Sequence, residues 1–491
     1  MRIESTSGGG SRRGIESGVF RATAAPLAIG VAATAAALAP DVRTKLALTA
    51  LALAALAFSA VCQSPRRWLY LFFAADLLLP PLPGAPGAAA IHVAPALAGV
   101  GIFAGVLERG RWRARFGPLE AALGAFSLSL VTSLPFAVVY SGADVAAGSA
   151  ARIALFLIGV YVFFYAAYGP GGSAQDVVRF SRFLFAAAAL TAAFACLDFY
   201  FHFPAPAGFS DQYVWLEDGV FRRAQGLFYD ASTLGNLCAC FLVYAFISLG
   251  ESAVPVARGR ARIFLIAGAL SLATALMLSY SRASVVNVAV AMSAYAFLKR
   301  ARIRRMLAGA LIGSGVAAMA VTAFYPSFAA NYWSHLNGTI RYLAERPDGV
   351  LSGRLTNWRV LVDFIASHPW QTLFGIGYKT LPYASYLGDP VIADNTWLSL
   401  LVETGLAGLG TFVALLALIL KTTLRAAKSP RPNTAFLGRW TFCFWCGEAV
   451  QMMSGDLLTY WRVLPVYFWA LGAVVSAVAV DGTADDVESG E

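Results

Sequence analysis

The chain carries very little charge for its length. Only 13% of its 491 residues are Asp, Glu, Lys or Arg, whereas 58% are hydrophobic and the mean hydropathy is +0.65. An ordinary soluble domain has roughly 25% charged residues. Apolar stretches of about 20 residues, long enough to cross a bilayer as a helix, recur along nearly the whole chain. The alternation typical of an outer-membrane barrel is missing, so we expect an all-α polytopic membrane protein.

Residues that bind metals are also scarce. The chain has four histidines and six cysteines, and every cysteine lies in an apolar stretch. Cys443 and Cys446 have C-x-x-C spacing, but no second pair and no suitably spaced histidine accompanies them. We therefore interpret the cysteines as small packing residues. No Asp-x-Asp pair marks the loops expected outside the membrane, and we expect neither a metal nor another cofactor.

The hydropathy pattern predicts about 12–14 transmembrane helices in two blocks. A tail at 1–21 precedes a bundle at 22–325, and a long loop at 326–395 leads to C-terminal helices at 396–480 and an acidic, disordered tail at 481–491. The predicted spans lie near 22–40, 44–62, 68–80, 88–107, 119–140, 148–168, 181–203, 232–250, 262–280, 283–299, 304–325, 396–421, 436–453 and 460–480.

The net charge of +10 is explained by membrane topology. Most of the 37 Lys and Arg residues fall in the N-terminal tail and in alternate loops, which would share one side of the membrane. Basic loops remain on the cytoplasmic side, so both termini are predicted inside and the loop 326–395 outside. We assign no nucleic-acid role to this charge.

Ionisable groups next to membrane spans are costly and are candidates for function. The arginines expected on the outer face are Arg152, Arg222, Arg223, Arg282, Arg341, Arg346, Arg354, Arg359 and Arg462. Arg282 lies between two apolar spans with almost no loop, which would hold its side chain close to the membrane. The alternative is that it only reaches towards lipid head groups.

The long loop contains its own helical pattern. The apolar residues Leu355, Trp358, Leu361, Val362 and Ile365 recur at helical spacing. This spacing predicts an amphipathic helix on the surface of the bundle or membrane. Arg354 would lie in its first turn, and Pro369 would end it.

Two carboxylates mark the end of the loop. Asp394 and Glu403 flank the outer start of the following span. Asp394 is a candidate base, although it could simply cap that helix. Glu403 would lie deeper and orient Asp394 or an arginine.

These residues resemble the O-antigen ligase/polymerase superfamily of bacterial inner-membrane glycosyltransferases, over about residues 220–410. The similar segments are Arg223-Ala224-Gln225-Gly226-Leu227-Phe228 with Asn236; Ser281-Arg282; Ser352-Gly353-Arg354 with Trp358, His368-Pro369 and Gly375-Ile376-Gly377; and Asn395-Thr396-Trp397-Leu398 with Glu403, Gly405 and Gly408. Four segments in this order, each at its place in the predicted topology, are hard to obtain by chance.

The resemblance implies a GT-C-type, metal-independent glycosyl transfer at the periplasmic face. The donor would be an oligosaccharide on undecaprenyl diphosphate, and the acceptor a growing glycan or lipid A–core. Arg223, Arg282 and Arg354 would bind the diphosphate, since the planar guanidinium pairs with phosphate oxygens. Asp394 would be the base, His368 a weaker candidate, and Glu403 a substrate-binding residue. Membrane lipid and, as further partners, a chain-length regulator or other envelope assembly proteins are expected.

One departure from the family pattern favours a polymerase over a ligase. Ligases typically place a histidine before the asparagine of the closing motif, where this chain has Asp394. Two other classes remain as alternatives. A polysaccharide-lipid transporter or flippase would be expected to show internal repeats, and we see none. A non-catalytic scaffold would not explain arginines at helix junctions beside a long ordered loop.

Overall fold

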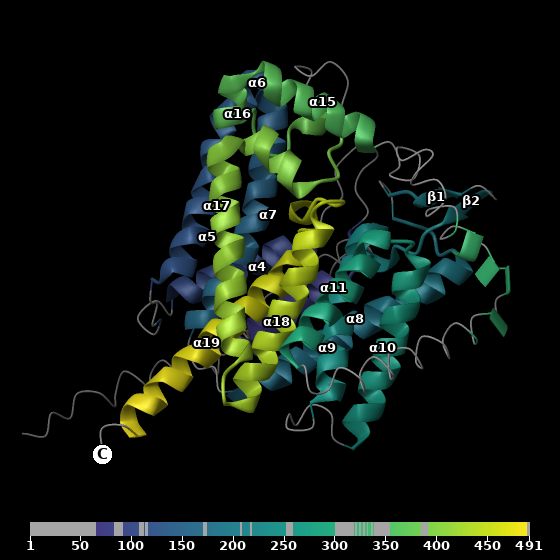
Figure 1. The fold of residues 1–491 in the computed structure, drawn as a ribbon, viewed down its shortest axis with the longest axis vertical. Helices are drawn as coiled ribbons and strands as arrows, with labels where there is room; N and C mark the ends of the chain where they lie inside the picture. The colour runs from purple at the N-terminus through teal and green to yellow at the C-terminus, as the bar shows by residue number, and fades with distance from the viewer. Residues whose placement is uncertain are drawn as a thin grey trace, which may run out of the picture. The chain divides into compact units, whose positions relative to one another are not determined.

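The computed structural model describes most of the chain from residue 65 onward (Figure 1). The described residues are 65–82, 92–107, 112, 116–169, 174–206, 209–216, 219–251, 259–299, single positions between 319 and 337, 354–383 and 391–488. The predicted spans 22–40 and 44–62, most of 304–325, and Arg341, Arg346, Ser352 and Gly353 lie outside the described residues.

The chain divides into two compact units, one of residues 1–72 and 96–109 and the other of residues 73–95 and 110–491. The boundaries run through α3 (Pro65–Leu78) and α4 (Val93–Leu107). Within the smaller unit, the Trp68 indole N–H donates to the carbonyl of Leu97 (2.6 Å). All features of the candidate site lie in the larger unit.

The larger unit is a helical bundle with one small hairpin. Its elements are α5 (Pro118–Thr132), α6 (Leu134–Ser141), α7 (Ala143–Tyr168), α8 (Ala174–Phe201), β1 (Tyr213–Leu216), β2 (Gly219–Arg222), η2 (Gly226–Phe228), α9 (Ala231–Gly250), α10 (Arg260–Leu278), α11 (Arg282–Leu298), α15 (Arg354–Ser367), α16 (Pro369–Phe374), η5 (Leu381–Tyr383), α17 (Thr396–Ala427), α18 (Pro432–Gln451), η7 (Leu457–Thr459) and α19 (Leu464–Glu488). The strands β1 and β2 pair antiparallel, with Tyr213 opposite Arg222.

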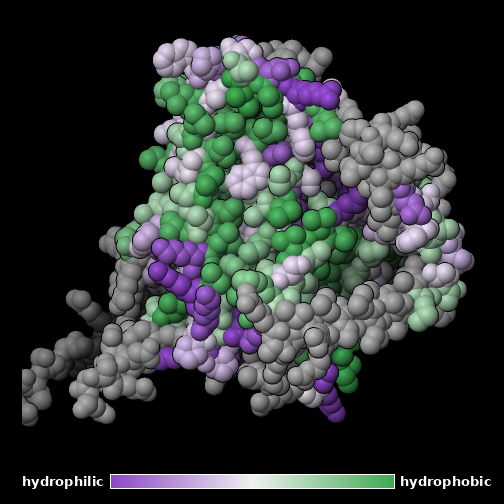
Figure 2. Space-filling model, viewed as in Figure 1, coloured by the Kyte–Doolittle hydropathy of each residue, from purple (hydrophilic) through white to green (hydrophobic). Residues whose placement is uncertain are grey.

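The helices have the length and composition of membrane spans, which confirms the predicted fold class. Six helical stretches in the described part of the chain are long and apolar enough to cross a bilayer: Pro118–Ser141, Ala143–Tyr168, Asp176–Phe201, Ala231–Gly250, Arg260–Leu278 and Thr396–Ala427. Hydrophobic residues cover much of the long helices, and hydrophilic residues gather towards their ends (Figure 2).

Packing in the bundle joins both consecutive helices and helices that are distant in sequence. The most extensive contacts are those of α7 with α19, α11 with α18, α17 with both α18 and α5, and α8 with α10. A second group joins α8, α9 and α10. At one end of α17, the short helices α6, α15 and α16 lie across the bundle (Figure 1). These short helices carry the residues that position the candidate site.

Two glycines allow the segment after α16 to lie directly on α17. The backbone of α17 is interrupted at Gly405 (φ 71°, ψ −175°). A Cβ added there would lie 2.3 Å from the Leu373 carbonyl oxygen, and one added to Gly375 (φ +82°) would lie 2.4 Å from the Glu403 carbonyl oxygen. The N–H groups of Ile376 and Gly377 donate to the carbonyls of Val402 and Glu403 (3.0 and 2.9 Å). The interrupted helix therefore provides acceptors for the glycine-rich turn.

Two local expectations need correction, and one is confirmed. The tail was predicted to be disordered, but α19 continues to Glu488. The loop helix ends before Pro369, as predicted, and Pro369 also begins α16, where proline's missing N–H is no loss. Val362 was predicted on the packed face of the loop helix but is 52% exposed, whereas Phe364 is 7% exposed and packs in the core. The buried face is therefore rotated towards Leu361 and Phe364.

Candidate functional site

One face of α15 holds the segment that leads into Asp394. The Asn357 side-chain amide and the Trp358 indole N–H donate to the carbonyls of Ile392 and Ala393 (3.0 and 2.7 Å). Arg354 lies one turn earlier on the same face, and its Nε lies 3.2 Å from Oδ2 of Asp394. Its predicted position in the first turn of the helix is confirmed. The loop helix therefore places an arginine against the candidate base.

Asp394 does not cap the following helix. The cap of α17 is Asn395, whose side-chain oxygen accepts from the N–H groups of Trp397 and Leu398 (3.0 and 3.1 Å). The alternative interpretation of Asp394 as a helix cap is therefore wrong. Its backbone adopts φ +42°, and its carboxylate, with a side chain 46% exposed, pairs with Arg354. The carboxylate is thus available for chemistry rather than committed to the helix end.

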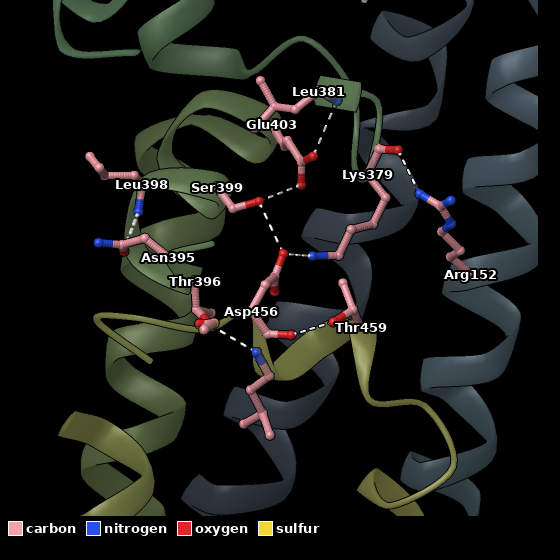
Figure 3. Close-up of polar contacts among 12 residues, drawn as sticks. Arg152, Lys379, Leu381, Asn395, Thr396, Leu398, Ser399, Glu403, Asp456 and Thr459 are labelled. Atoms are coloured by element: carbon pink, nitrogen blue, oxygen red, sulfur yellow. Dashed lines mark hydrogen bonds and ion pairs between the residues drawn. The ribbon is translucent and has the colours of Figure 1, made fainter. Parts of the chain in front are cut away.

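The start of α17 is tied to the turn between α18 and α19. The Thr396 N–H donates to the carbonyls of Met452 and Gly455 (2.9 and 3.2 Å), and the Thr396 hydroxyl accepts from the Leu457 N–H (3.1 Å). This contact brings Asp456 to the site, where its carboxylate forms an ion pair with the ammonium group of Lys379 (Figure 3). Both side chains are largely buried.

Glu403 lies next to this second ion pair and is linked to Asp456 through the Ser399 hydroxyl. The Ser399 hydroxyl donates to Oε2 of Glu403 (3.1 Å) and lies 3.3 Å from Oδ2 of Asp456. The Leu381 N–H lies 3.4 Å from Oε1 of Glu403. The expectation that Glu403 orients Asp394 or an arginine is not supported by any described contact. Instead, Glu403 fixes the loop that carries Lys379, as Figure 3 shows.

Arg223 is held at the end of the small hairpin. Its Nε donates to the carbonyl of Ser279 (2.8 Å), and the Ala224 N–H donates to the carbonyl of Leu278 (2.9 Å). Burial lowers the pKa of Arg223; Asp230 opposes this effect, and the charge of Arg354 adds to it. Arg223 is therefore anchored through Nε beside the end of α10, within electrostatic reach of Arg354.

Arg282 follows this anchor directly and begins α11. The connection from α10 is only Ser279 to Ser281, with Tyr280 in the left-handed region (φ 51°). Arg282 experiences the charges of both Arg354 and Arg223. These three residues, which we call the arginine cluster, come from separate parts of the sequence and lie close enough to influence one another electrostatically. Three like charges held together suit a ligand with several negative charges.

Two other predicted outer-face arginines have structural partners. Arg222 is buried and donates to the Asp198 carbonyl (2.6 Å) and to the Asp211 carboxylate (2.8 Å). Arg462 donates to the carbonyls of Asp76 and Leu227 (2.9 and 2.5 Å). Buried guanidinium groups occupied in this way connect elements of the fold. They are not part of the arginine cluster.

His368 lies at the junction of α15 and α16. Its ring stacks on Phe364 (4.5 Å between centroids), and its Nδ1 lies 3.1 Å from the Phe364 carbonyl oxygen at the end of α15. It does not line the pocket described below. Its role as a second base stays a prediction that this geometry does not favour.

Asn236, part of the first family-like segment, lies inside the bundle. Its side-chain amide donates to Oε2 of Glu448 (2.7 Å), which also accepts from the Asn287 amide (2.8 Å). Gln451 extends this buried network to Ser284 (3.2 Å). Asn236 therefore contributes to helix packing between α9, α11 and α18.

A pocket of about 460 Å³ opens beside Asp394. Its polar lining includes Arg152, Asp230, Lys379, Asp394, Ser399, Glu403, Asp456, Thr459 and Tyr460. Sequence analysis missed Lys379 and Asp456 as site residues. Asp456 lies in the short turn between the predicted spans 436–453 and 460–480. A charged residue in a short turn between two spans is the same signal that singled out Arg282. Lys379 had no comparable signal, because it lies in a loop without a clear pattern.

The fold and the site together define an all-α polytopic membrane protein with an arginine cluster and a carboxylate-lined pocket at one end of its bundle. Residues 267–413 match the family model described as O-Antigen ligase. This match confirms the resemblance to the O-antigen ligase/polymerase superfamily and supports a function of that type. The matched segment includes Arg282, Arg354 and Asp394. No curated protein matches the chain.

Proposed function

We propose that the protein transfers glycan from undecaprenyl diphosphate at the outer face of the bacterial inner membrane, as a metal-independent polymerase of surface polysaccharide. The observation that carries this proposal is the meeting of Arg354 and Asp394 (3.2 Å) beside Arg223 and Arg282. A lipid diphosphate leaving group gains negative charge as its bond to the sugar breaks. Fixed arginines stabilise such charge through paired hydrogen bonds.

In the proposed reaction, a hydroxyl group of the acceptor attacks the anomeric carbon of the donor sugar. The acceptor proton moves to the Asp394 carboxylate, and the bond between the anomeric carbon and the phosphate oxygen breaks. The lipid diphosphate leaves with the electron pair, held by the arginine cluster. Glu403 acts at a distance by fixing Ser399 and the loop that carries Lys379.

The ion pair in this structure suggests how the donor makes the base available. When the donor diphosphate binds Arg354, it competes with Asp394 for the guanidinium group. Donor binding would therefore free the Asp394 carboxylate to accept a hydrogen bond from the acceptor hydroxyl group.

The test uses the full chain in nanodiscs with undecaprenyl-diphosphate oligosaccharide as the substrate. We expect a ladder of longer lipid-linked chains, and we expect Asp394→Asn and Arg282→Gln to abolish it. Arg359→Gln serves as the matched control, because Arg359 lies on an exposed part of α15. Inertness towards authentic donor, with and without lipid A–core, would refute the proposal.

A ligase is the second candidate, favoured by the description of the matching family model. Transfer that appears only after lipid A–core is added would identify a ligase. A ladder that survives both Asp394→Asn and Arg282→Gln would keep the function but discard the proposed site.

A further inference from the structure

We propose that the pocket beside Asp394 binds the acceptor sugar and selects a neutral, hydroxyl-rich sugar over an acidic one. This inference rests on the proposed function. The pocket volume of about 460 Å³ lies within the range of about 300–1,000 Å³ that is common for small-molecule sites. Asp394 lines the pocket and also pairs with Arg354 of the arginine cluster. An acceptor in the pocket would therefore present its hydroxyl group to the residue that also faces the donor.

Acidic residues outnumber cationic residues in the lining of the pocket. Four carboxylates line it: those of Asp230, Asp394, Glu403 and Asp456. Lys379 and Arg152 are its two cationic residues, and the ammonium group of Lys379 is already paired with Asp456. Because ionised carboxylates only accept hydrogen bonds, the complementary ligand supplies O–H donors. Sugar hydroxyl groups meet this requirement.

Arg152 is placed to contact a ligand without being part of the arginine cluster. Its guanidinium donates to the Lys379 carbonyl (2.9 Å) and lies 3.4 Å from the Tyr383 hydroxyl oxygen. Figure 3 shows it reaching from α7 towards the loop of Lys379. No carboxylate in the described part of the chain forms an ion pair with it within 4.0 Å. Arg152 therefore keeps donor capacity at the rim of the pocket.

Tyr460 and Trp461 complete the lining with aromatic rings. Such side chains combine a large apolar face with a polar end. A sugar has the matching character, since its ring carbons are apolar and its hydroxyl groups are polar. The combination of carboxylates, one available arginine and two aromatic rings thus fits a pyranose better than a lipid chain or a phosphate.

The same charges would exclude an acidic sugar. The carboxylate of a uronic acid would enter a pocket lined by four acidic residues and two cationic ones, in which Lys379 is already paired with Asp456 and Asp394 with Arg354. Like charges brought together at a binding site weaken association and give specificity. We expect a uronate to bind at least tenfold more weakly than the matched neutral sugar.

The experiment uses the full chain in nanodiscs and the oligosaccharide released by mild acid from the cell's own lipid-linked donor. The matched probe is the same oligosaccharide with its primary hydroxyl groups oxidised to carboxylates. Binding is measured by titration with ligand-observed NMR. The proposal expects the neutral form to bind and the oxidised form to bind at least tenfold more weakly. Equal binding of both forms, no binding of the neutral form, or a uronate at the acceptor end of the native glycan would overturn it.

Three variants, with a fourth in reserve, separate the pocket from the arginine cluster. Arg152→Gln should weaken binding of the neutral oligosaccharide about threefold to tenfold, through lost hydrogen bonds. Arg282→Gln should leave that binding unchanged. Asp456→Asn leaves Lys379 uncompensated and should reduce the discrimination against the oxidised form at least threefold. If the Asp456→Asn protein does not fold, Ser399→Ala replaces it. This variant removes a hydroxyl group from the lining and should weaken binding of the neutral oligosaccharide.

The outcomes distinguish this inference from the proposed function. If the neutral oligosaccharide binds as predicted but no lipid-linked donor supports transfer, the assignment of the pocket is supported and the proposed function is refuted. If transfer proceeds but Arg152→Gln leaves both acceptor binding and the KM for the acceptor unchanged, the function stands and the pocket assignment fails.

Discussion

Replacing Gly405 by alanine should separate the glycine-rich turn from α17. Gly405 adopts φ 71° and ψ −175°, a region open essentially only to glycine, and a side chain there costs about 1–3 kcal/mol. The new Cβ would also lie 2.3 Å from the Leu373 carbonyl oxygen and 2.8 Å from the Gly375 nitrogen. Both neighbours are backbone atoms, so no side-chain rotation relieves the contact.

The loss of stability depends on the contacts that break when the glycine-rich turn moves away from α17. Displacing the turn breaks the hydrogen bonds from Ile376 to Val402 and from Gly377 to Glu403 (3.0 and 2.9 Å), which contribute about 1 kcal/mol each. Together with the backbone strain, we expect a loss of about 3–5 kcal/mol in the free energy of unfolding. The loop that carries Lys379 would shift with the turn, so glycan transfer should fall as well.

Gly410→Ala is the matched control in the same helix. No atom lies within 4 Å of a Cβ added at Gly410, and alanine in a helix is favoured over glycine by about 1 kcal/mol. Thermal unfolding in detergent, followed by tryptophan fluorescence, should show a midpoint several degrees lower for Gly405→Ala and unchanged or higher for Gly410→Ala. A Gly405→Ala protein as stable as the wild type would refute the idea that this interruption positions the turn.

Two further predictions compare neighbouring residues by the same thermal unfolding assay. Asn395→Ala should lower stability by about 1 kcal/mol, because it removes the cap of α17. Asp394→His keeps a side chain that tolerates the left-handed backbone but is not a preferred helix cap, so it should leave stability nearly unchanged; the reverse order would restore Asp394 as the cap. Arg222→Gln should lower stability by about 3 kcal/mol, since it leaves the Asp198 carboxylate buried without its partner, whereas Arg223→Gln should mainly reduce transfer. Equal losses of stability in both arginine variants would contradict the distinction between structural and cluster arginines.

The parts of the site that sequence reasoning found are those with a regular local pattern. The helical spacing of Leu355, Trp358, Leu361 and Ile365 predicted α15 and put Arg354 in its first turn. The same pattern misassigned Val362, because spacing alone does not fix the rotation of a helix about its axis. Contacts of Leu361 and Phe364 with Val391 and Val402 decide that rotation, and they depend on distant segments.

The ion pair of Lys379 and Asp456 shows what local patterns miss. The two residues are 77 positions apart and are joined only by the turns that dock on the start of α17. The Gly375-Ile376-Gly377 segment lies just before Lys379, but it does not distinguish this lysine from a solvated loop lysine. The contacts of Thr396 with Gly455 and Leu457 bring the pair together, and no single segment encodes them.

The residue before the closing Asn-Thr-Trp segment is restricted by its backbone as well as by its chemistry. Asp394 has φ +42°, in the left-handed region, where Asp, Asn and His are the side chains found most often after glycine. Asn395 caps α17, and side chains of α15 bind the carbonyls of residues 392 and 393. The backbone on both sides of residue 394 is therefore fixed, so any side chain at this position projects from the same Cα position. An aspartate there forms an ion pair with Arg354, whereas a neutral histidine has no charge with which to form one. The exchange of His for Asp would therefore preserve the position of the base but change its coupling to the arginine that we assign to the donor.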